Sequence, residues 1–235
     1  MRKCYFISGG TSSIGKATIE KIKLQNEKAK IVYTYFKNEK ENKKILAKYN
    51  NIYSFKINLE KENSIKKLKK ISEHFDAIIL TAAQTKFYDI KKFKNFKPEL
   101  FKKIININLI NQYYIVYYLL KNLKKNSHVV FISSVASKNA IGSNAAYSAS
   151  KAAINNLAIF FARALAGKVY VNSVAPGLMR TKLTKSFKES YFKKYKDKTL
   201  SKKLSTPENI ADFILYLISE KNNITGQTIF IDGGC

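Results

Sequence analysis

The stretch Ser8-Gly9-Gly10-Thr11-Ser12-Ser13-Ile14-Gly15 lies between an apolar run at Lys3–Ser8 and a helical pattern at Ile14–Gln25. Glycines at this spacing are typical of a tight turn that joins a strand to a helix in a parallel sheet. Gly9 permits the turn, and Gly15 permits close packing of the helix on the strand. Backbone amides at the start of such a helix form a site for phosphate groups. The stretch therefore predicts an α/β fold that opens with a phosphate-binding turn.

The rest of the chain alternates short β-type runs with helical patterns. Strands are expected at Lys3–Ser8, Lys30–Tyr35, Ile52–Ile57, Ala77–Leu80, Val129–Ser133, Val169–Val174 and Thr228–Ile231. Helices are expected at Ile14–Gln25, Glu39–Tyr49, Lys61–Glu73, Pro98–Leu123, Ala146–Ala166, about Tyr191–Tyr195, and Pro207–Ser219. Continuously apolar strands indicate a parallel sheet covered by helices on both faces. The pattern predicts one doubly wound, Rossmann-type domain over residues 1–235, with about seven strands.

Composition sets further limits. The chain has 235 residues, of which 46% are hydrophobic, enough to bury one full core. No apolar run approaches the length of a membrane span, and Met1-Arg2-Lys3 leads directly into a predicted strand without a signal-peptide pattern. The two cysteines, Cys4 and Cys235, give neither a disulfide framework nor metal-ligand spacing. We therefore expect a cytoplasmic protein without a membrane partner or a metal.

The formal net charge of +27 raises the question of nucleic-acid binding. Only Arg2, Arg163 and Arg180 are arginine, although phosphate and base recognition favours the planar guanidinium group. The lysines are spread through nearly every predicted helix. We expect a solvated basic surface and no nucleic-acid partner, while attraction to an acidic partner remains an alternative.

A candidate active site surrounds Tyr147-Ser148-Ala149-Ser150-Lys151. Tyr147 and Lys151 are four residues apart and so share one face of the predicted helix. Ser134 ends an apolar run thirteen residues upstream and would face Tyr147 from a strand tip. A phenol has a pKa of about 10, and a nearby ammonium lowers that pKa and makes the tyrosine a usable proton donor and acceptor. The three residues together predict an enzyme.

These motifs resemble the short-chain dehydrogenase/reductase family, classical type, over almost the whole chain. The glycine motif Thr-Gly-x-x-x-Gly-x-Gly is matched by Ser8–Gly15, with Ser13 at the middle glycine. The resemblance implies that Asn108 completes a catalytic tetrad by holding a water that links the lysine to solvent. Asn106 and Asn111 are near enough to be alternatives for that role. The implied tetrad is Asn108, Ser134, Tyr147 and Lys151.

The resemblance also implies a nicotinamide dinucleotide cofactor. Asn172–Gly177 with Thr181 looks like the family's nicotinamide-side segment, and Ile224–Gln227 with Asp232–Gly234 looks like its C-terminal signature. The cofactor-binding positions that it implies are Gly9, Thr11, Ser12, Ser13, Ile14, Gly15, Tyr35, Lys37, Asn58, Leu59, Ala82, Ala83, Tyr147, Lys151, Pro176, Gly177, Met179 and Thr181.

Departures from the family pattern bear on this cofactor site. Thr81-Ala82-Ala83-Gln84 replaces Asn-Asn-Ala-Gly and loses the asparagine that braces the sheet, and Asn58 replaces an adenine-contacting aspartate. The second predicted strand is followed by Phe36 and Lys37, with no acid until Glu39. A carboxylate there would bind a ribose 2′-hydroxyl, whereas Lys37 would attract a 2′-phosphate. We therefore expect NADP(H) to be favoured over NAD(H).

The resemblance implies an oxidoreductase that interconverts a ketone and a secondary alcohol. Length and C-terminal half look most like 3-oxoacyl-(acyl-carrier-protein) reductases, whose acidic carrier would suit a basic surface. Two alternatives stay open: a reductase of a sugar or other polar metabolite in polysaccharide or secondary metabolism, and a catalytically silent dinucleotide-sensing protein. The filled tetrad favours an enzyme.

Three further expectations concern the surroundings of the site. The Lys/Ser/Thr-rich segment Leu178–Thr206 is expected to form a substrate lid, and the Gln84–Asn95 loop to contact substrate. His74 and His128 are interpreted as ordinary loop residues. The helices at Pro98–Leu123 and Ala146–Ala166 have more apolar surface than one sheet face covers, which predicts a homotetramer or homodimer.

Overall fold

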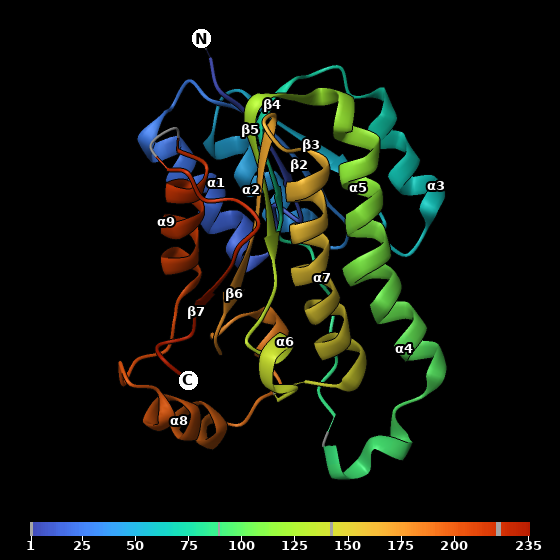
Figure 1. Cartoon of the computed structure of the whole chain (residues 1–235), viewed down its shortest axis with the longest axis vertical. Coiled ribbons are helices and arrows are strands. Elements are labelled where there is room, and N and C mark those ends of the chain that lie inside the picture. Colours follow the sequence, from blue (N-terminus) through green and yellow to red (C-terminus); the bar gives the residue numbers. More distant parts are fainter. Residues whose placement is uncertain (1, 89, 142, 220–221) are drawn as a thin grey trace.

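The computed structural model describes residues 2–88, 90–141, 143–219 and 222–235. Within these residues, seven parallel strands form one sheet in the order β3-β2-β1-β4-β5-β6-β7 (Figure 1). The strands are β1 (Cys4–Ser8), β2 (Lys30–Tyr35), β3 (Ile52–Lys56), β4 (Phe75–Leu80), β5 (Leu123–Ile132), β6 (Val169–Pro176) and β7 (Thr228–Ile231). The order reverses between β1 and β4, which is where doubly wound sheets bind ligands. The predicted fold class is confirmed.

Helices cover both faces of this sheet, and each face has its own apolar cluster. Helices α1 (Ser13–Gln25), α2 (Glu39–Lys48) and α9 (Pro207–Leu217) pack on one face, where Ile19, Ile45 and Ile214 are buried. Helices α3 (Glu62–Ile65), α5 (Asn111–Leu119) and α7 (Ala145–Ala164) pack on the other (Figure 1). Neighbours within a strand, such as Phe6 and Ile7, belong to opposite clusters. This two-sided burial explains why the strands are apolar without alternation.

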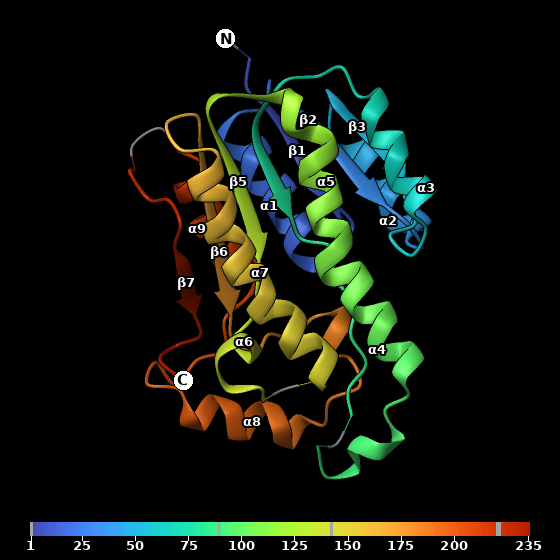
Figure 2. The same ribbon diagram turned by 45° about the vertical axis from the view of Figure 1, so that its right-hand side comes forward.

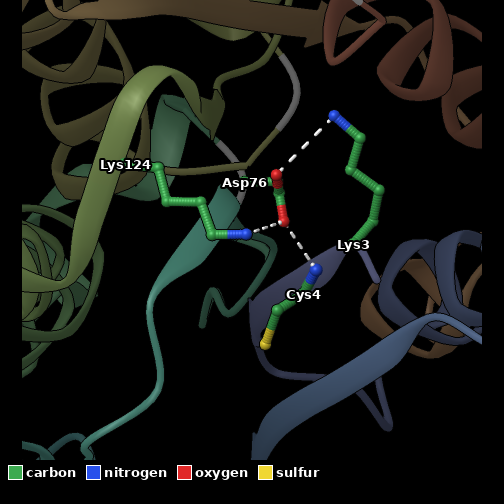
Figure 3. A network of polar contacts seen from close by, with 4 residues as sticks. All are labelled: Lys3, Cys4, Asp76 and Lys124. Atoms are coloured by element: carbon green, nitrogen blue, oxygen red, sulfur yellow. Dashed lines mark hydrogen bonds and ion pairs between the residues drawn. The ribbon is translucent and has the colours of Figure 1, made fainter. Parts of the chain in front are cut away.

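One carboxylate ties together three strands at the amino-terminal edge of the sheet (Figure 3). The backbone amide of Cys4 in β1 and the ammonium of Lys124 in β5 each donate to Asp76 Oδ2 in β4, both at 2.7 Å. Lys3 Nζ lies 3.6 Å from Asp76 Oδ1. Burial raises the pKa of the neighbouring Cys4 thiol to about 11, so this thiol stays protonated at neutral pH. The network therefore aligns β1, β4 and β5 at the edge opposite the carboxyl ends.

The carboxyl ends of the strands face a separate group of short elements. The 3-10 segments η2 (Ile90–Asn95) and η5 (Lys182–Thr184), with α6 (Ala136–Asn139) and α8 (Glu189–Lys198), lie beyond this edge (Figure 2). Residues of α6, η5 and α8 line a cavity at this edge, where ligands are expected in such a sheet.

The predicted helix Pro98–Leu123 is wrong as a continuous element. It consists of α4 (Pro98–Ile105), a π-helical turn η3 (Asn106–Ile110), α5, and a 3-10 turn η4 (Leu120–Asn122). The amide of Asn111 donates to the carbonyl of Asn106, five residues back. The wider turn contains Asn108, which is fully buried and bonded to a neighbouring loop. A π-turn inside a helix frequently marks a functional site.

Two other predicted ranges need correction. The expected helix Lys61–Glu73 is only α3 followed by the 3-10 segment η1 (Lys66–Lys70), because Ile65, Leu68 and Ile71 are buried at a spacing of three, the repeat of a 3-10 helix. Strand β5 begins at Leu123 instead of Val129, because its polar first half pairs with β4 at Phe75. His128 is therefore a buried strand residue, stacked on Tyr170, and not a loop residue.

Candidate active site

The turn after β1 has the geometry that its glycines predicted. Gly9 has a φ of +76°, in the left-handed region, and a Cβ there would lie 2.8 Å from the Ala82 backbone. A Cβ on Gly15 would lie 2.4 Å from the carbonyl oxygen of Gly9, so this position requires glycine. Ser12 caps α1 by accepting a hydrogen bond from the Gly15 amide at 3.0 Å. The amides that open α1 at Ser13 and Ile14 have no intrahelical acceptor, which leaves them suited to a phosphate.

Thr81 replaces the missing family asparagine as a brace for this turn. Its hydroxyl is 2.7 Å from the carbonyl oxygen of Ser8 and 3.1 Å from that of Gly9, and it lies 3.0 Å from Ser12 Oγ. These contacts join the end of β4 to the turn after β1. The turn therefore has a side-chain brace although the asparagine is absent.

Helix α7 presents the tyrosine and the lysine to the same space. Asn144 caps this helix, since its side chain accepts a hydrogen bond from the Tyr147 amide at 2.8 Å. The same side chain donates to the carbonyl of Lys86 at 2.7 Å and so fixes the loop after β4 against the helix start. Ser134 follows β5 and lines the same cavity as Tyr147, and its side chain acts on the pKa of the phenol. The two residues predicted to act together therefore lie in one cavity wall.

Lys151 is almost completely buried behind Tyr147. Its Nζ donates to the carbonyl of Ile132 at 2.6 Å and lies 5.7 Å from the centroid of the Tyr147 ring. Burial lowers the pKa of Lys151 to about 8. The pKa of Lys151 is thus close enough to neutral pH for its side chain to exchange a proton there.

The pKa of Tyr147 moves in the direction opposite to the prediction. Burial raises this pKa, and the hydrogen bond with Ser134 opposes the rise. The Lys151 ammonium does not compensate, because it is held by the Ile132 carbonyl and is itself destabilised by burial. In this arrangement Tyr147 is a protonated phenol at neutral pH, suited to donating a proton.

Asn108 lies in the π-turn and holds the loop after β4. Its side chain accepts from the Gln84 amide at 2.8 Å and donates to the Gln84 carbonyl at 2.9 Å. It also lies 3.3 Å from Ser150 Oγ, one residue before Lys151. Of the alternatives, Asn111 donates instead to the carbonyl of Leu59. The role of Asn108 in a water relay stays a prediction.

Two adjoining cavities occupy the carboxyl edge. The first, of about 260 Å³, has Ser134, Tyr147 and Lys151 in its wall. The other predicted residues in its wall are Ser12, Ser13, Ile14, Ala83, Pro176, Gly177, Met179 and Thr181. The second cavity, of about 400 Å³, is lined by the predicted residues Gly9, Thr11, Ser12, Tyr35, Lys37, Asn58, Leu59, Ala82 and Ala83. Gly15 and Asn108 line neither cavity.

Several residues in these walls were not singled out from the sequence. Thr85 and Ser143 are hydrogen-bonded to each other and line the first cavity, and Lys182 lines both. Their residue types are common in loops, and nothing in their spacing distinguishes them. The predicted cofactor-binding residue Asn58 lines the second cavity, and its Oδ1 accepts a hydrogen bond from the Glu60 amide at 2.9 Å.

The described parts of the chain contain no group of three or more His, Cys, Asp or Glu side chains that could hold a metal ion. Over the same parts, no helix is both long enough and apolar enough to cross a membrane.

Known proteins similar to this chain agree with the site. Residues 9–235 match a family model described as enoyl-(acyl carrier protein) reductase. The 3-oxoacyl-[acyl-carrier-protein] reductase FabG of Buchnera aphidicola subsp. Schizaphis graminum is 30% identical over 243 residues, 99% of this chain and 97% of the relative. The 3alpha-hydroxysteroid dehydrogenase of Mediterraneibacter gnavus is 26% identical over 98% of this chain and 96% of the relative. A solved short-chain dehydrogenase/reductase of Brucella melitensis is 25% identical, with a TM-score of 0.90 covering 100% of this chain and 98% of that one.

The sheet, the helix-capping turn and the serine–tyrosine–lysine group define an oxidoreductase of the dinucleotide-binding α/β class. The chain belongs to the short-chain dehydrogenase/reductase family, whose enzymes depend on NAD(P).

Proposed function

We propose that this protein is an NADP(H)-dependent reductase of a 3-oxoacyl thioester or a similar apolar ketone. The main support is the presence of Ser134, Tyr147 and Lys151 together in the wall of one cavity. The cavity adjoins the amino terminus of α1, where a pyrophosphate fits the amides that open the helix. The protein's own residues thus fit a dinucleotide beside a proton donor.

Each residue of the group has a role in this proposal. A bound nicotinamide supplies the hydride. Tyr147 donates its proton to the carbonyl oxygen as negative charge develops there, and Ser134 donates a hydrogen bond to the same oxygen. Lys151 binds the nicotinamide ribose and passes a proton to the tyrosine, with Asn108 supporting the relay.

The lining of the second cavity supports a preference for NADP(H). Lys37 lines this cavity beside Tyr35, and the acid Glu39 is not in its wall; it pairs with Lys56. We expect wild-type protein to bind NADPH more tightly than NADH, and Lys37→Glu to narrow or reverse that preference. Calorimetric titration of both cofactors measures this, with Lys40→Glu as a control of equal charge change. Tighter NADH binding by wild type would overturn the preference.

The lining of the first cavity supports an apolar substrate. It includes Ile141, Leu178, Leu183, Phe187 and Tyr191. These side chains favour an acyl chain over a sugar. By their names, two relatives act on a 3-oxoacyl-[acyl-carrier-protein] and on a 3alpha-hydroxysteroid. We further propose an acidic carrier protein as the natural donor of the substrate, because the net charge is +27.

A panel of ketones tests the reaction, with oxidation of NADPH followed by absorbance. Acetoacetyl thioesters of carrier protein and of coenzyme A should be reduced faster than keto-sugars. The carrier-bound substrate should have the lower KM, and this advantage should shrink in high salt. Binding of NADPH without turnover on any ketone would instead support the dinucleotide-sensing class, and faster reduction of keto-sugars would support the polar-metabolite alternative.

A further inference from the structure

The two cavities meet at a place marked by three residues. Ser12, Ala83 and Lys182 line both of them. Ser12 is the residue that caps α1, so the junction lies at the amino terminus of that helix. Lys182 belongs to a different wall, because it opens the 3-10 segment η5 within the expected lid. A cation from the lid therefore stands at the place where phosphate groups are expected.

The backbone around Lys182 is fixed by local hydrogen bonds. Thr181 caps η5, and its amide donates to Thr184 Oγ1 at 3.0 Å. The Thr184 hydroxyl in turn donates to the carbonyl of Met179 at 2.7 Å. Met179 is buried against the sheet cluster and anchors this stretch. The base of Lys182 is thus held in place while its side chain stays exposed.

The positive charge of Lys182 acts on a carboxylate of α2. The pKa of Glu41 on α2 is lowered, first by the hydrogen bond from Lys16 and also by the positive charge of Lys182. Lys16 already forms an ion pair with Glu41 at 2.9 Å, and that carboxylate is largely buried. None of the ion pairs found among the described residues includes Lys182. Its ammonium is therefore able to bind a second anion that enters between α1 and the lid.

We propose that Lys182 binds the pyrophosphate of the dinucleotide, so that cofactor binding fastens the start of the lid over the active site. The inference rests on the proposed cofactor binding. The pyrophosphate is favoured over the 2′-phosphate because Lys182 shares the junction with Ser12. Lys37 lies in the second cavity with Tyr35, away from the junction. The lid would then be ordered before substrate binds, since its closing contact is made by the cofactor.

Titration calorimetry with four proteins tests the binding contact. We expect Lys182→Met to weaken the binding of NADPH and of NADH by the same factor, about tenfold, because both cofactors contain the pyrophosphate. Lys37→Met should weaken NADPH only. Lys185→Met is the matched control, since Lys185 is an exposed lysine of the same segment that lines neither cavity, and it should bind both cofactors as wild type does. Adenosine 2′-monophosphate, which lacks both phosphates of the pyrophosphate, should bind wild type and Lys182→Met equally.

Chymotrypsin cleavage tests the coupling to the lid, which contains Phe187 and Tyr191. NADP⁺ should slow cleavage there in wild type and Lys185→Met, and should do so much less in Lys182→Met at saturating cofactor. Lys182→Arg should restore both affinity and protection. Equal NADPH affinity of wild type and Lys182→Met, or a loss limited to NADPH, would refute the contact. A wild-type protein that binds no dinucleotide at all would refute the proposed function itself, which separates the two failures.

Discussion

Tyr147 shares its cavity wall with Ser134, whose side chain opposes the rise of the tyrosine pKa that burial causes. We expect Tyr147→Phe to keep the fold but to lose at least about a hundredfold in turnover, because the ring remains and the transferable proton is lost. Ser134→Ala should also reduce turnover. His74→Ala, an exposed position outside both cavities, serves as the control. Near-normal turnover by Tyr147→Phe in the NADPH assay would refute the mechanism.

Lys151 makes the stability of the protein depend on pH. Burial places its folded pKa at about 8, below the value of about 10.4 expected for an unfolded chain. Between these two pH values the unfolded chain binds more protons at this position, so the contribution of Lys151 to the free energy of unfolding rises with pH. Relative to Lys151→Met, wild type should gain about 2 kcal/mol from about pH 8 to about pH 10. Urea unfolding of both proteins at both pH values measures this difference. An equal change of unfolding free energy with pH in the two proteins would contradict a buried ammonium at Lys151.

Much of the candidate site was predictable because its residues occur at motif positions. The spacing of Tyr147 and Lys151 on a helix, with Ser134 at a strand end, was sufficient to bring them into one cavity wall. The pKa direction of Tyr147 was not predictable, because it depends on burial and on the carbonyl that holds Lys151. Lys182 was missed because a lid lysine in a chain this basic has no distinguishing pattern.

At the scale of secondary-structure elements, the carboxylate of Asp76 joins the strands β1, β4 and β5 (Figure 3). Asp76→Asn keeps the shape of the side chain but removes the charge that pairs with Lys124 and Lys3. We expect the free energy of unfolding to fall by about 1–3 kcal/mol, because the site is largely buried and its hydrogen bonds are charge-assisted. Glu62→Gln, which breaks an exposed ion pair with Lys66, should cost less than about 1 kcal/mol. Chemical denaturation measures both free energies of unfolding. Equal losses for Asp76→Asn and Glu62→Gln would show that the Asp76 contacts stabilise the fold no more than an exposed ion pair does.

Element boundaries were predictable where apolar periodicity was strong and failed where a local contact decided the conformation. Helices α1 and α9 match their predicted ranges to within two residues at each end. The π-turn at Asn106–Ile110 depends on the bonds between Asn108 and Gln84, which connect segments far apart in sequence. The first half of β5 was not predicted because it contains polar residues. One of them, Lys124, is explained by its hydrogen bond to Asp76 on the neighbouring strand.

At the scale of the whole molecule, the described residues leave an apolar face on α5 and α7 uncovered. Tyr117 and Phe160 are each 58% exposed, and Tyr113 stacks on both Tyr117 and Phe161. Exposed aromatic groups of this kind on neighbouring helices are suited to a two-fold contact between identical chains. The net charge of +27 on each chain opposes that contact and is screened by salt.

We therefore expect a homo-oligomer, a tetramer built from such dimers, whose association strengthens from low to moderate salt. Light scattering during size exclusion measures the mass directly. Phe160→Glu should shift the protein to a smaller species, because it places a carboxylate in the contact. Leu24→Glu, at a residue 81% exposed on α1, should leave the mass unchanged. A monomer at micromolar concentration at both salt levels would refute the assembly, and the aromatic face would then require a different partner to cover it.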